Sequence, residues 1–168
     1  AVFTPDAVTA PEEFEIMLAE TGEQMIGTPT ESAIDGVETV TLGADDAVYA
    51  GEGNDTVLAG GGNDHIDAGP GADRLDGGAG DDTLIGGTGT DTYVYGLGAG
   101  RDTIDEAFLI PDGGAPEVDT VELGSGIAPA DVTLHRDGQD LVIAVTQTAA
   151  QLRVRGHFVA FDRVFNHQ

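Results

Sequence analysis

Aspartate is the residue type that could do chemistry here, because it recurs every nine residues through the middle of the chain. Carboxylates are preferred ligands of hard divalent cations, together with backbone carbonyl oxygens. The recurring residues are Asp55, Asp64, Asp73, Asp82 and Asp91, each followed two positions later by Val57, Ile66, Leu75, Leu84 or Tyr93. A solvated acidic face is the usual meaning of a charge run. The fixed spacing instead indicates a repeated metal-binding loop.

The repeated unit is a block of nine residues. It has Gly at positions two and four, Asp at position six and a large apolar residue at position eight. Five consecutive blocks cover residues 50 to 94: AGEGNDTVL, AGGGNDHID, AGPGADRLD, GGAGDDTLI and GGTGTDTYV. A block before them, residues 41 to 49, keeps Asp46 and Val48 without the glycines. A block after them, residues 97 to 105, has Asp102 and Ile104 and follows two extra residues.

Each block predicts a turn followed by a short strand. Glycine permits the positive φ values of a tight turn, and three remaining residues form a strand whose middle side chain points inward. Two blocks would complete one coil of a flattened helix. One sheet would stack Val48, Ile66 and Leu84, and the other would stack Val57, Leu75 and Tyr93. The sequence therefore predicts an all-β fold, a parallel β-roll.

The same stacking places like charges on top of one another. One edge would carry Asp46, Asp64 and Asp82, and the other would carry Asp55, Asp73 and Asp91. Coils ~4.8 Å apart would bring these carboxylates into repulsion, and a core of one side chain per strand is thin. Calcium resolves the repulsion better than magnesium, which keeps strict octahedral geometry and its waters. We therefore expect several calcium ions, about three to five.

The amino-acid composition limits which binding partners and which classes of protein are possible. The 168 residues carry a net charge of -25, from 31 acidic and 6 basic residues, which argues against nucleic acid or anionic lipid as partners. There are no cysteines, so a metal is the expected staple. No apolar run approaches the ~20 residues that span a bilayer. The first residues do not form a signal peptide, so any export signal would lie elsewhere.

Nothing in the sequence indicates catalysis. The four histidines show no metal spacing and are expected to be surface or strand residues: His65, His135, His157 and His167. No zinc-protease, nucleophile-elbow or phosphate-loop motif is present. We predict that this chain is not itself an enzyme, although a larger protein containing it could be one.

Both flanks differ from the repeats. Between Thr9 and Gly22 the pattern predicts a short helix with Phe14, Met17 and Leu18 on one face. Val37, Val40 and Leu42 predict a strand that leads into the roll. After the roll, alternation on both sides of residues 136–139 predicts a hairpin, and Leu152, Val154 and Phe158 predict a further strand. The expected organisation is an N-terminal cap or linker (1–40), the roll (41–105) and an antiparallel β cap (106–168).

The blocks resemble the RTX (repeats-in-toxin) haemolysin-type calcium-binding nonapeptide repeat. The resemblance implies that each ion lies between two loops one coil apart. The first loop would supply the carbonyls of positions two and four with its Asp, and the second those of positions one and three with its Asp. The segment containing Asp119–Leu123, Ile127–Val132 and Asp140–Ile143 is similar to the haemolysin-type calcium-binding related region that follows such repeats.

Carried over by position, the resemblance implies three complete sites and two incomplete ones. The first would use Gly51, Gly53 and Asp55 with Ala68, Pro70 and Asp73. The second would use Gly60, Gly62 and Asp64 with Gly77, Ala79 and Asp82. The third would use Gly69, Gly71 and Asp73 with Gly86, Thr88 and Asp91. The incomplete ones are Leu42, Ala44 and Asp46 with Ala59, Gly61 and Asp64, and Gly78, Gly80 and Asp82 with Leu97, Ala99 and Asp102. Asn54, Asn63 and Asp81, at position five, are expected to form turns rather than bind metal.

By the same resemblance, the chain is part of a larger exported protein that folds on binding calcium outside a Gram-negative bacterium after type I secretion. Two alternatives stay open. One is an adhesin or carbohydrate-binding appendage of a polysaccharide-modifying enzyme, and the other is the C-terminal part of a secreted protease or lipase. Arg153, Arg155 and Arg163 form the only basic cluster. They are expected to pair with nearby acids, with an anionic glycan as the alternative.

Overall fold

The structure is a computed structural model that describes residues 45–105, 118–146 and 148–158, and the backbone of Ile16–Met17, Gln24–Ile26 and Glu38–Val40. These residues form strands joined by tight loops. The strands are β1 (Ile16–Met17), β2 (Gln24–Ile26), β3 (Glu38–Val40), β4 (Ala47–Tyr49), β5 (Thr56–Leu58), β6 (His65–Gly71), β7 (Arg74–Asp76), β8 (Thr83–Gly89), β9 (Thr92–Tyr95), β10 (Arg101–Ile104), β11 (Thr120–Leu123), β12 (Val132–Asp137), β13 (Asp140–Val145) and β14 (Gln151–Val154).

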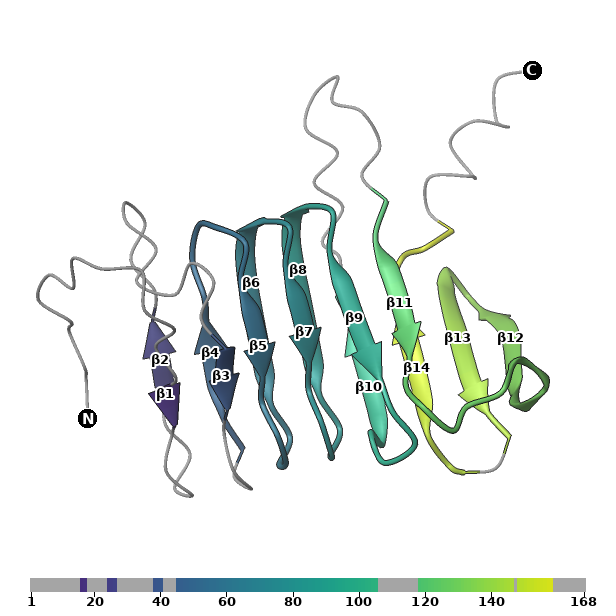
Figure 1. The fold of residues 1–168 in the computed structure, drawn as a ribbon. Coiled ribbons are helices and arrows are strands. Elements are labelled where there is room, and N and C mark those ends of the chain that lie inside the picture. Colours follow the sequence, from purple (N-terminus) through teal and green to yellow (C-terminus); the bar gives the residue numbers. More distant parts are fainter. Residues whose placement is uncertain are drawn as a thin grey trace, which may run out of the picture.

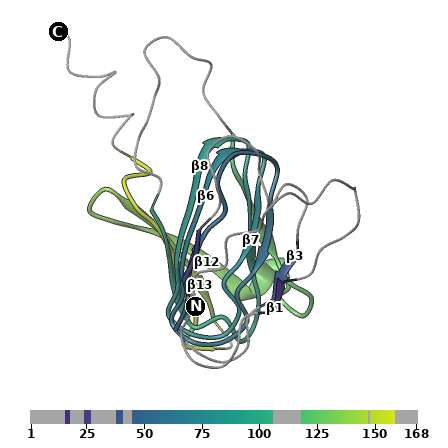
Figure 2. The same cartoon turned by 90° about the vertical axis from the view of Figure 1, so that its left-hand side faces the viewer.

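From β1 to β12, successive strands alternate between two sheets, as Figure 1 shows. The six-stranded sheet has the order β1-β3-β5-β7-β9-β11, and the eight-stranded sheet has the order β12-β13-β14-β10-β8-β6-β4-β2. Every pairing between β1 and β11 is parallel. Viewed along the stack, the coils superimpose as one flattened loop (Figure 2). The predicted parallel β-roll is confirmed.

The register between coils is the predicted 18 residues. Val48 pairs with Ile66, and Ile66 pairs with Leu84. In the six-stranded sheet Val57 pairs with Leu75, and Leu75 pairs with Tyr93. These six side chains are all buried and form the centre of the core, while their neighbours in the strands are half-buried. Each strand of the roll thus contributes little more than one large side chain, as expected.

Two tyrosines close the interior at the end of the repeats. The Tyr93 hydroxyl accepts a hydrogen bond from the Gly86 amide at 2.9 Å, and the Tyr95 hydroxyl donates to the Gly100 carbonyl at 2.9 Å. A Cβ atom on Gly86 would lie 2.4 Å from the Tyr93 hydroxyl, so the first position of this block has to be glycine. Large aromatic residues fit inside the thin core because their polar ends bond to the turns.

Two insertions interrupt the spacing without breaking the register. Thr103 pairs with Thr83 after 20 residues instead of 18, and Thr120 pairs with Thr92 after 28. In the first insertion, a Cβ placed on Gly96 or Gly98 would meet nothing within 4 Å, so the loop bulges outward there. The loop can therefore vary in length as long as the strands return to the sheet in phase.

The N-terminal helix is a wrong prediction at the residues that the structure describes. Ile16–Met17 form strand β1, which pairs in parallel with β3. Phe14 and Leu18, predicted to share the helix face, lie outside the described residues. Strand pairing to the open edge of β3 satisfies backbone groups that a short helix satisfies only marginally in water. The strand predicted before the roll is confirmed as β3.

We use "the cap" for strands β12 to β14 with the short 3-10 helix Pro129–Asp131 that precedes them. The predicted hairpin is confirmed: β12 and β13 are antiparallel, with Leu134 opposite Ile143. Strand β14 is also confirmed over Gln151–Val154, but Phe158 lies beyond it. Because β14 is antiparallel to β13 and parallel to β10, it joins the cap to the roll.

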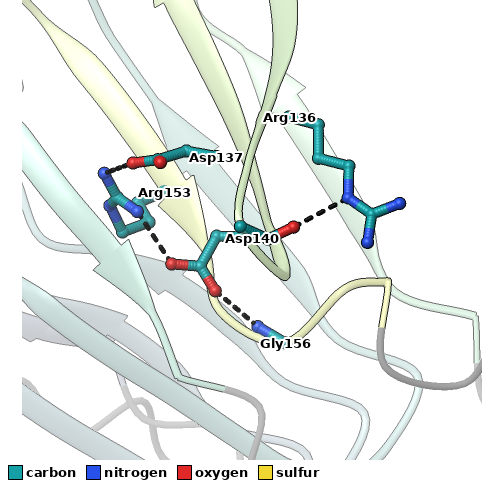
Figure 3. A network of polar contacts seen from close by, with 6 residues as sticks. Arg136, Asp137, Asp140, Arg153 and Gly156 are labelled. Carbon is teal, nitrogen blue, oxygen red and sulfur yellow. Dashed lines mark hydrogen bonds and ion pairs between the residues drawn. The ribbon is translucent and has the colours of Figure 1, made fainter. Parts of the chain in front are cut away.

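Ion pairs hold the cap together. Arg153 lies between Asp137 and Asp140, at N–O distances of 2.8 and 2.7 Å, and the other Asp140 oxygen accepts the Gly156 amide (Figure 3). Arg155 pairs with Asp105 at the end of the roll. The prediction that these arginines pair with acids is confirmed for Arg153 and Arg155, whereas Arg163 lies outside the described residues.

Candidate calcium sites between the coils

The aspartates stack along two edges of the roll, as predicted. We use "the first edge" for the loops that contain Asp46, Asp64, Asp82 and Asp102, which lead into the eight-stranded sheet. We use "the second edge" for the loops that contain Asp55, Asp73 and Asp91, which lead into the six-stranded sheet. All seven side chains are buried.

Every stacked aspartate from Asp64 to Asp102 reaches back to the coil before it through one oxygen. On the first edge, the Asp64 Oδ1 accepts the Asp46 amide at 2.8 Å, and the Asp82 Oδ1 accepts the Asp64 amide at 2.8 Å. On the second edge, the Asp73 Oδ1 accepts the Asp55 amide at 2.7 Å. This repeated bond fixes the orientation of these three carboxylates and leaves their Oδ2 atoms for another partner.

That second oxygen is the polar atom that the protein leaves unsatisfied. In Asp64, Asp73 and Asp82 the Oδ2 atom is buried and makes no hydrogen bond within the structure. A buried carboxylate oxygen without a partner is costly, and buried charges are normally paired or bound to metal. Three such atoms at equivalent positions indicate that the repeat is completed by a cation.

The glycines bring carbonyl oxygens into the same spaces. A Cβ atom on Gly69 would lie 2.1 Å from the Gly51 carbonyl oxygen, and one on Gly71 would lie 1.6 Å from that of Gly53. The carbonyls at positions two and four therefore point along the coil axis toward the next coil. A side chain at the same positions one coil on would fill that space, which explains why glycine recurs there.

Carbonyls from the next coil point the opposite way. The Ala68 carbonyl accepts the Gly51 amide at 3.0 Å, and the Pro70 carbonyl accepts the Gly53 amide at 3.0 Å. A carbonyl oxygen has two lone pairs, so each retains one for a further partner. Residues predicted for the first site thus lie on the two facing loops of one inter-coil space.

The other two complete sites have the same arrangement. Gly80 would place a Cβ 1.7 Å from the Gly62 carbonyl, and the Ala79 carbonyl accepts the Gly62 amide at 2.9 Å. Gly89 would place a Cβ 1.6 Å from the Gly71 carbonyl, and Pro70 pairs with Thr88 in register. At position one, a Cβ on Gly77 would lie 2.3 Å from the Asp82 Oδ2, and one on Gly86 would lie 2.3 Å from the Asp91 Oδ2.

The two incomplete sites differ from this pattern. Leu42 and Ala44 lie outside the described residues, so the structure places only Asp46 and its partners in the later loop. At the other end, the Gly80 amide donates to the Ala99 carbonyl at 3.1 Å, and the Asp102 Oδ1 accepts the Asp82 amide at 3.2 Å. Leu97 lies in the outward bulge and is 39% exposed. Of the residues predicted for this last site, the structure therefore brings Gly80 and Ala99 together, whereas Leu97 lies apart in the bulge.

Burial raises the pKa of four stacked carboxyl groups, those of Asp64, Asp73, Asp82 and Asp102. Desolvation is the largest cause, and it raises the pKa of Asp73 and of Asp82 to about 6 and that of Asp102 to about 8. Backbone hydrogen bonds lower these values in part, while neighbouring carboxylates raise them further. The ionised form is therefore disfavoured in this protein environment without a cation.

The donor set fits calcium and not a nitrogen- or sulfur-bound metal. Among the described residues, no three His, Cys, Asp or Glu side chains gather around one point. The ligand set predicted for each complete site is instead two aspartates and four backbone carbonyls, all oxygen, which would suit the large and flexible coordination shell of calcium. His65 lies on strand β6, His135 on strand β12 and His157 in the turn after β14.

Known proteins provide an independent comparison. The RTX calcium-binding nonapeptide repeat family matches three overlapping stretches, residues 41–75, 58–93 and 67–104. The chain carries RTX calcium-binding nonapeptide repeats. The resemblance drawn from the Asp and Gly spacing is thus confirmed, and such repeats are non-catalytic calcium-binding modules of secreted bacterial proteins. No curated protein matches the chain.

The RTX matches end at residue 104. The similarity of the following segment to the haemolysin-type related region therefore stays a prediction. Among the described residues, no helix is both long and apolar enough to cross a membrane.

Asp119 is a further member of the aspartate stack, which the nine-residue spacing does not predict. The Asp119 Oδ1 accepts the Asp91 amide at 3.0 Å, as each stacked aspartate does for the one before it. Strand β11, which follows directly, continues the six-stranded sheet. The available signal was Asp119 followed by Val121, which repeats the Asp-x-apolar spacing after a longer gap.

Proposed function

We propose that this chain is a calcium-triggered folding module of a larger exported protein. It would be unfolded where calcium is scarce and would fold on binding calcium outside the cell. The observation that carries this proposal is the series of buried, unsatisfied Oδ2 atoms of Asp64, Asp73 and Asp82. In a roll with so thin a core, such atoms oppose folding unless a cation lies between the coils.

The proposed ion positions are the inter-coil spaces of the three complete sites, with the two incomplete sites as further positions. Calcium would accept oxygen ligands from both loops of each space and so join adjacent coils. Because the site exists only when two coils are stacked, the free energy of binding becomes free energy of folding. Extracellular modules bind calcium with dissociation constants of ~10⁻⁴ to 10⁻³ M, close to the concentration outside cells.

This behaviour suits export of an unfolded chain. With low intracellular calcium, repulsion between ionised aspartates would keep the roll open for passage through a secretion channel, and we propose the type I pathway. Calcium outside would then fold the roll and stabilise whatever domain is attached to it. The glycan-binding alternative gains no support, because Arg153 and Arg155 are paired with acids.

A calcium titration of the whole chain tests the proposal. Circular dichroism in excess chelator should show a largely unfolded chain, and millimolar calcium should produce a β-sheet spectrum. Calorimetry should count about three to five ions per chain, and magnesium at the same concentration serves as the control. A full β spectrum in chelator, or folding by magnesium as well as calcium, would contradict a calcium switch.

A further inference from the structure

The fifth residue of each first-edge block from Asp45 to Asp81 has a role that neither metal binding nor turn formation describes. On the first edge, its side chain accepts the backbone amide of the fifth residue one coil on. The Asp45 Oδ1 accepts the Asn63 amide at 2.7 Å, and the Asn63 Oδ1 accepts the Asp81 amide at 2.9 Å. The Asp81 Oδ1 then accepts the Arg101 amide at 2.9 Å. We call each of these side-chain-to-amide bonds a rung.

The rungs run opposite to the bonds made by the sixth residues. Asn63 reaches forward to the next coil, whereas the carboxylate of Asp82 reaches back to the amide of Asp64. Two successive residues are therefore bonded across the same gap in opposite directions. Such a pair fixes both the separation and the lateral offset of the loops that would share an ion.

The second edge does not repeat this ladder. One rung is present, from the Ala72 amide to the Asn54 Oδ1 at 2.8 Å. The next would have to start from Ala72, which has no side-chain acceptor. Here β6 and β8 stay paired through the loop, with Gly69 opposite Gly87 and Gly71 opposite Gly89.

The first-edge loops lack that extended strand pairing among the described residues. Between the loops of Asn63 and Asp81, the bridge outside named strands is Gly61 opposite Ala79, and the next coil has Gly80 opposite Gly100. Among the described loops, rungs are therefore present where the extended strand pairing is absent, and the rung is missing where β6 and β8 stay paired. The two devices perform the same task in different gaps between coils.

We infer that Asp45, Asn63 and Asp81 are positioning residues for the calcium ions of the first edge. They hold successive loops at the offset at which carboxylates and carbonyls face one another, without binding the ion themselves. Asn63 sets how tightly the ion between loops 59–64 and 77–82 is held. This inference rests on the proposed calcium binding, and it adds a difference between the edges that the Asp and Gly pattern does not contain.

The test measures calcium release from the loaded full-length chain into excess fluorescent chelator. In Asn63→Ala, one kinetic phase of calcium release should become about fivefold faster, which corresponds to the loss of one hydrogen bond. The other phases and the total amount of calcium released should not change. Asn63→Asp keeps the accepting oxygen and should restore the slow phase. Ala72→Asn, the matched control, should change no phase because β6–β8 pairing already holds those loops.

Three outcomes would overturn the inference. In Asn63→Ala, these are faster release of all ions alike, which indicates general destabilisation, and no change in release at all. The third is slower calcium release in Ala72→Asn. If Asn63→Ala does not load calcium, the pair Asp45→Ala and Asp45→Asn applies the test at the first rung, where only the alanine should speed release. Calorimetry on the unaltered chain comes first, because a chain that binds no calcium refutes the proposed function itself.

Discussion

The roll and the cap solve the same problem, keeping strands together, with different chemistry. In the roll, glycine-rich loops stack buried aspartates, and each strand supplies about one large apolar side chain. In the cap, apolar residues pack from consecutive antiparallel strands, and Arg153 neutralises Asp137 and Asp140 directly. The cap carries its own counter-charges, whereas the roll needs them from solution. The two regions should therefore respond differently to calcium, substitution and pH.

Calcium removal should separate the two regions most strongly. If three ions are each held at about tenfold their dissociation constant, they contribute roughly 1.4 kcal/mol apiece, or about 4 kcal/mol together. That is a large share of the stability of a small domain. In excess chelator, amide hydrogen exchange should lose protection over residues 45–105, while the β12–β13 hairpin keeps part of its protection. Equal loss in both regions would show that the cap has no stability of its own.

Matched glycine substitutions should give the next largest difference. Gly80→Ala places a Cβ 1.7 Å from the Gly62 carbonyl, at a φ of 149°, so the coils cannot stack closely. We expect this change to cost more than about 3 kcal/mol, beyond ordinary point substitutions. Gly138→Ala, in the hairpin turn, has open space at a φ of 64° and should cost about 1 kcal/mol. Urea unfolding in millimolar calcium measures both, and similar losses would contradict close coil stacking.

Removing one carboxylate charge from the roll and one from the cap should give smaller effects, which differ between the two regions. Asp73→Asn keeps the shape but removes a charge that is predicted to serve two calcium sites, so the calcium midpoint of folding should rise about tenfold or more. Without calcium, the same change should weaken repulsion and stabilise the roll. Asp140→Asn weakens a partly exposed ion pair and should cost about 1 kcal/mol or less without moving the midpoint. Circular dichroism titrations of both variants check this, and an unmoved midpoint in Asp73→Asn would exclude it as a ligand.

Acid should act on the two regions with opposite signs when calcium is absent. The folded-state pKa is raised for Asp73 and Asp82 to about 6 and for Asp102 to about 8, from 3.8. Their contribution to roll stability is thus fully present below pH 3.8 and is lost as pH rises toward 6 to 8. The pKa of Asp140 is lowered, by the Gly156 amide and then by Arg153, so its contribution is present above pH 3.8 and is lost below it. Amide exchange in chelator at pH 4 and 7 should show roll protection rising with acid.

Local spacing was enough to predict the roll, because the same four positions recur and each has one physical meaning. Asp at position six, an apolar residue at position eight and glycine at positions two and four fix the coil length, the inward side chains and the facing carbonyls. The hairpin also followed from alternation around Asp137-Gly138. These features depend on residues near one another in the sequence or on an exact repeat.

The remaining features depend on contacts between segments without a common pattern. Ile16–Met17 read as part of a helix because the open edge of β3, which pairs with them, is not visible from their own sequence. Asp119 follows Asp91 in the stack after 28 residues, so the nine-residue spacing of the aspartates does not reveal it. The rungs of Asn63 and Asp81 were missed because turn formation already accounted for these residue types. The ligands assigned to each calcium ion also stay predictions, because the ions are not part of the polypeptide.

The outward bulge at Gly96–Gly98 carries a consequence for engineering. Since a coil contacts only its immediate neighbours, extra residues can leave the stack and return without propagating an error to distant coils. The bulge is thus a natural graft point, where a short peptide inserted next to Leu97 would be displayed on the outside of the solenoid. A graft there should preserve the spectrum at saturating calcium, whereas the same insert between Gly69 and Asp73 should abolish it.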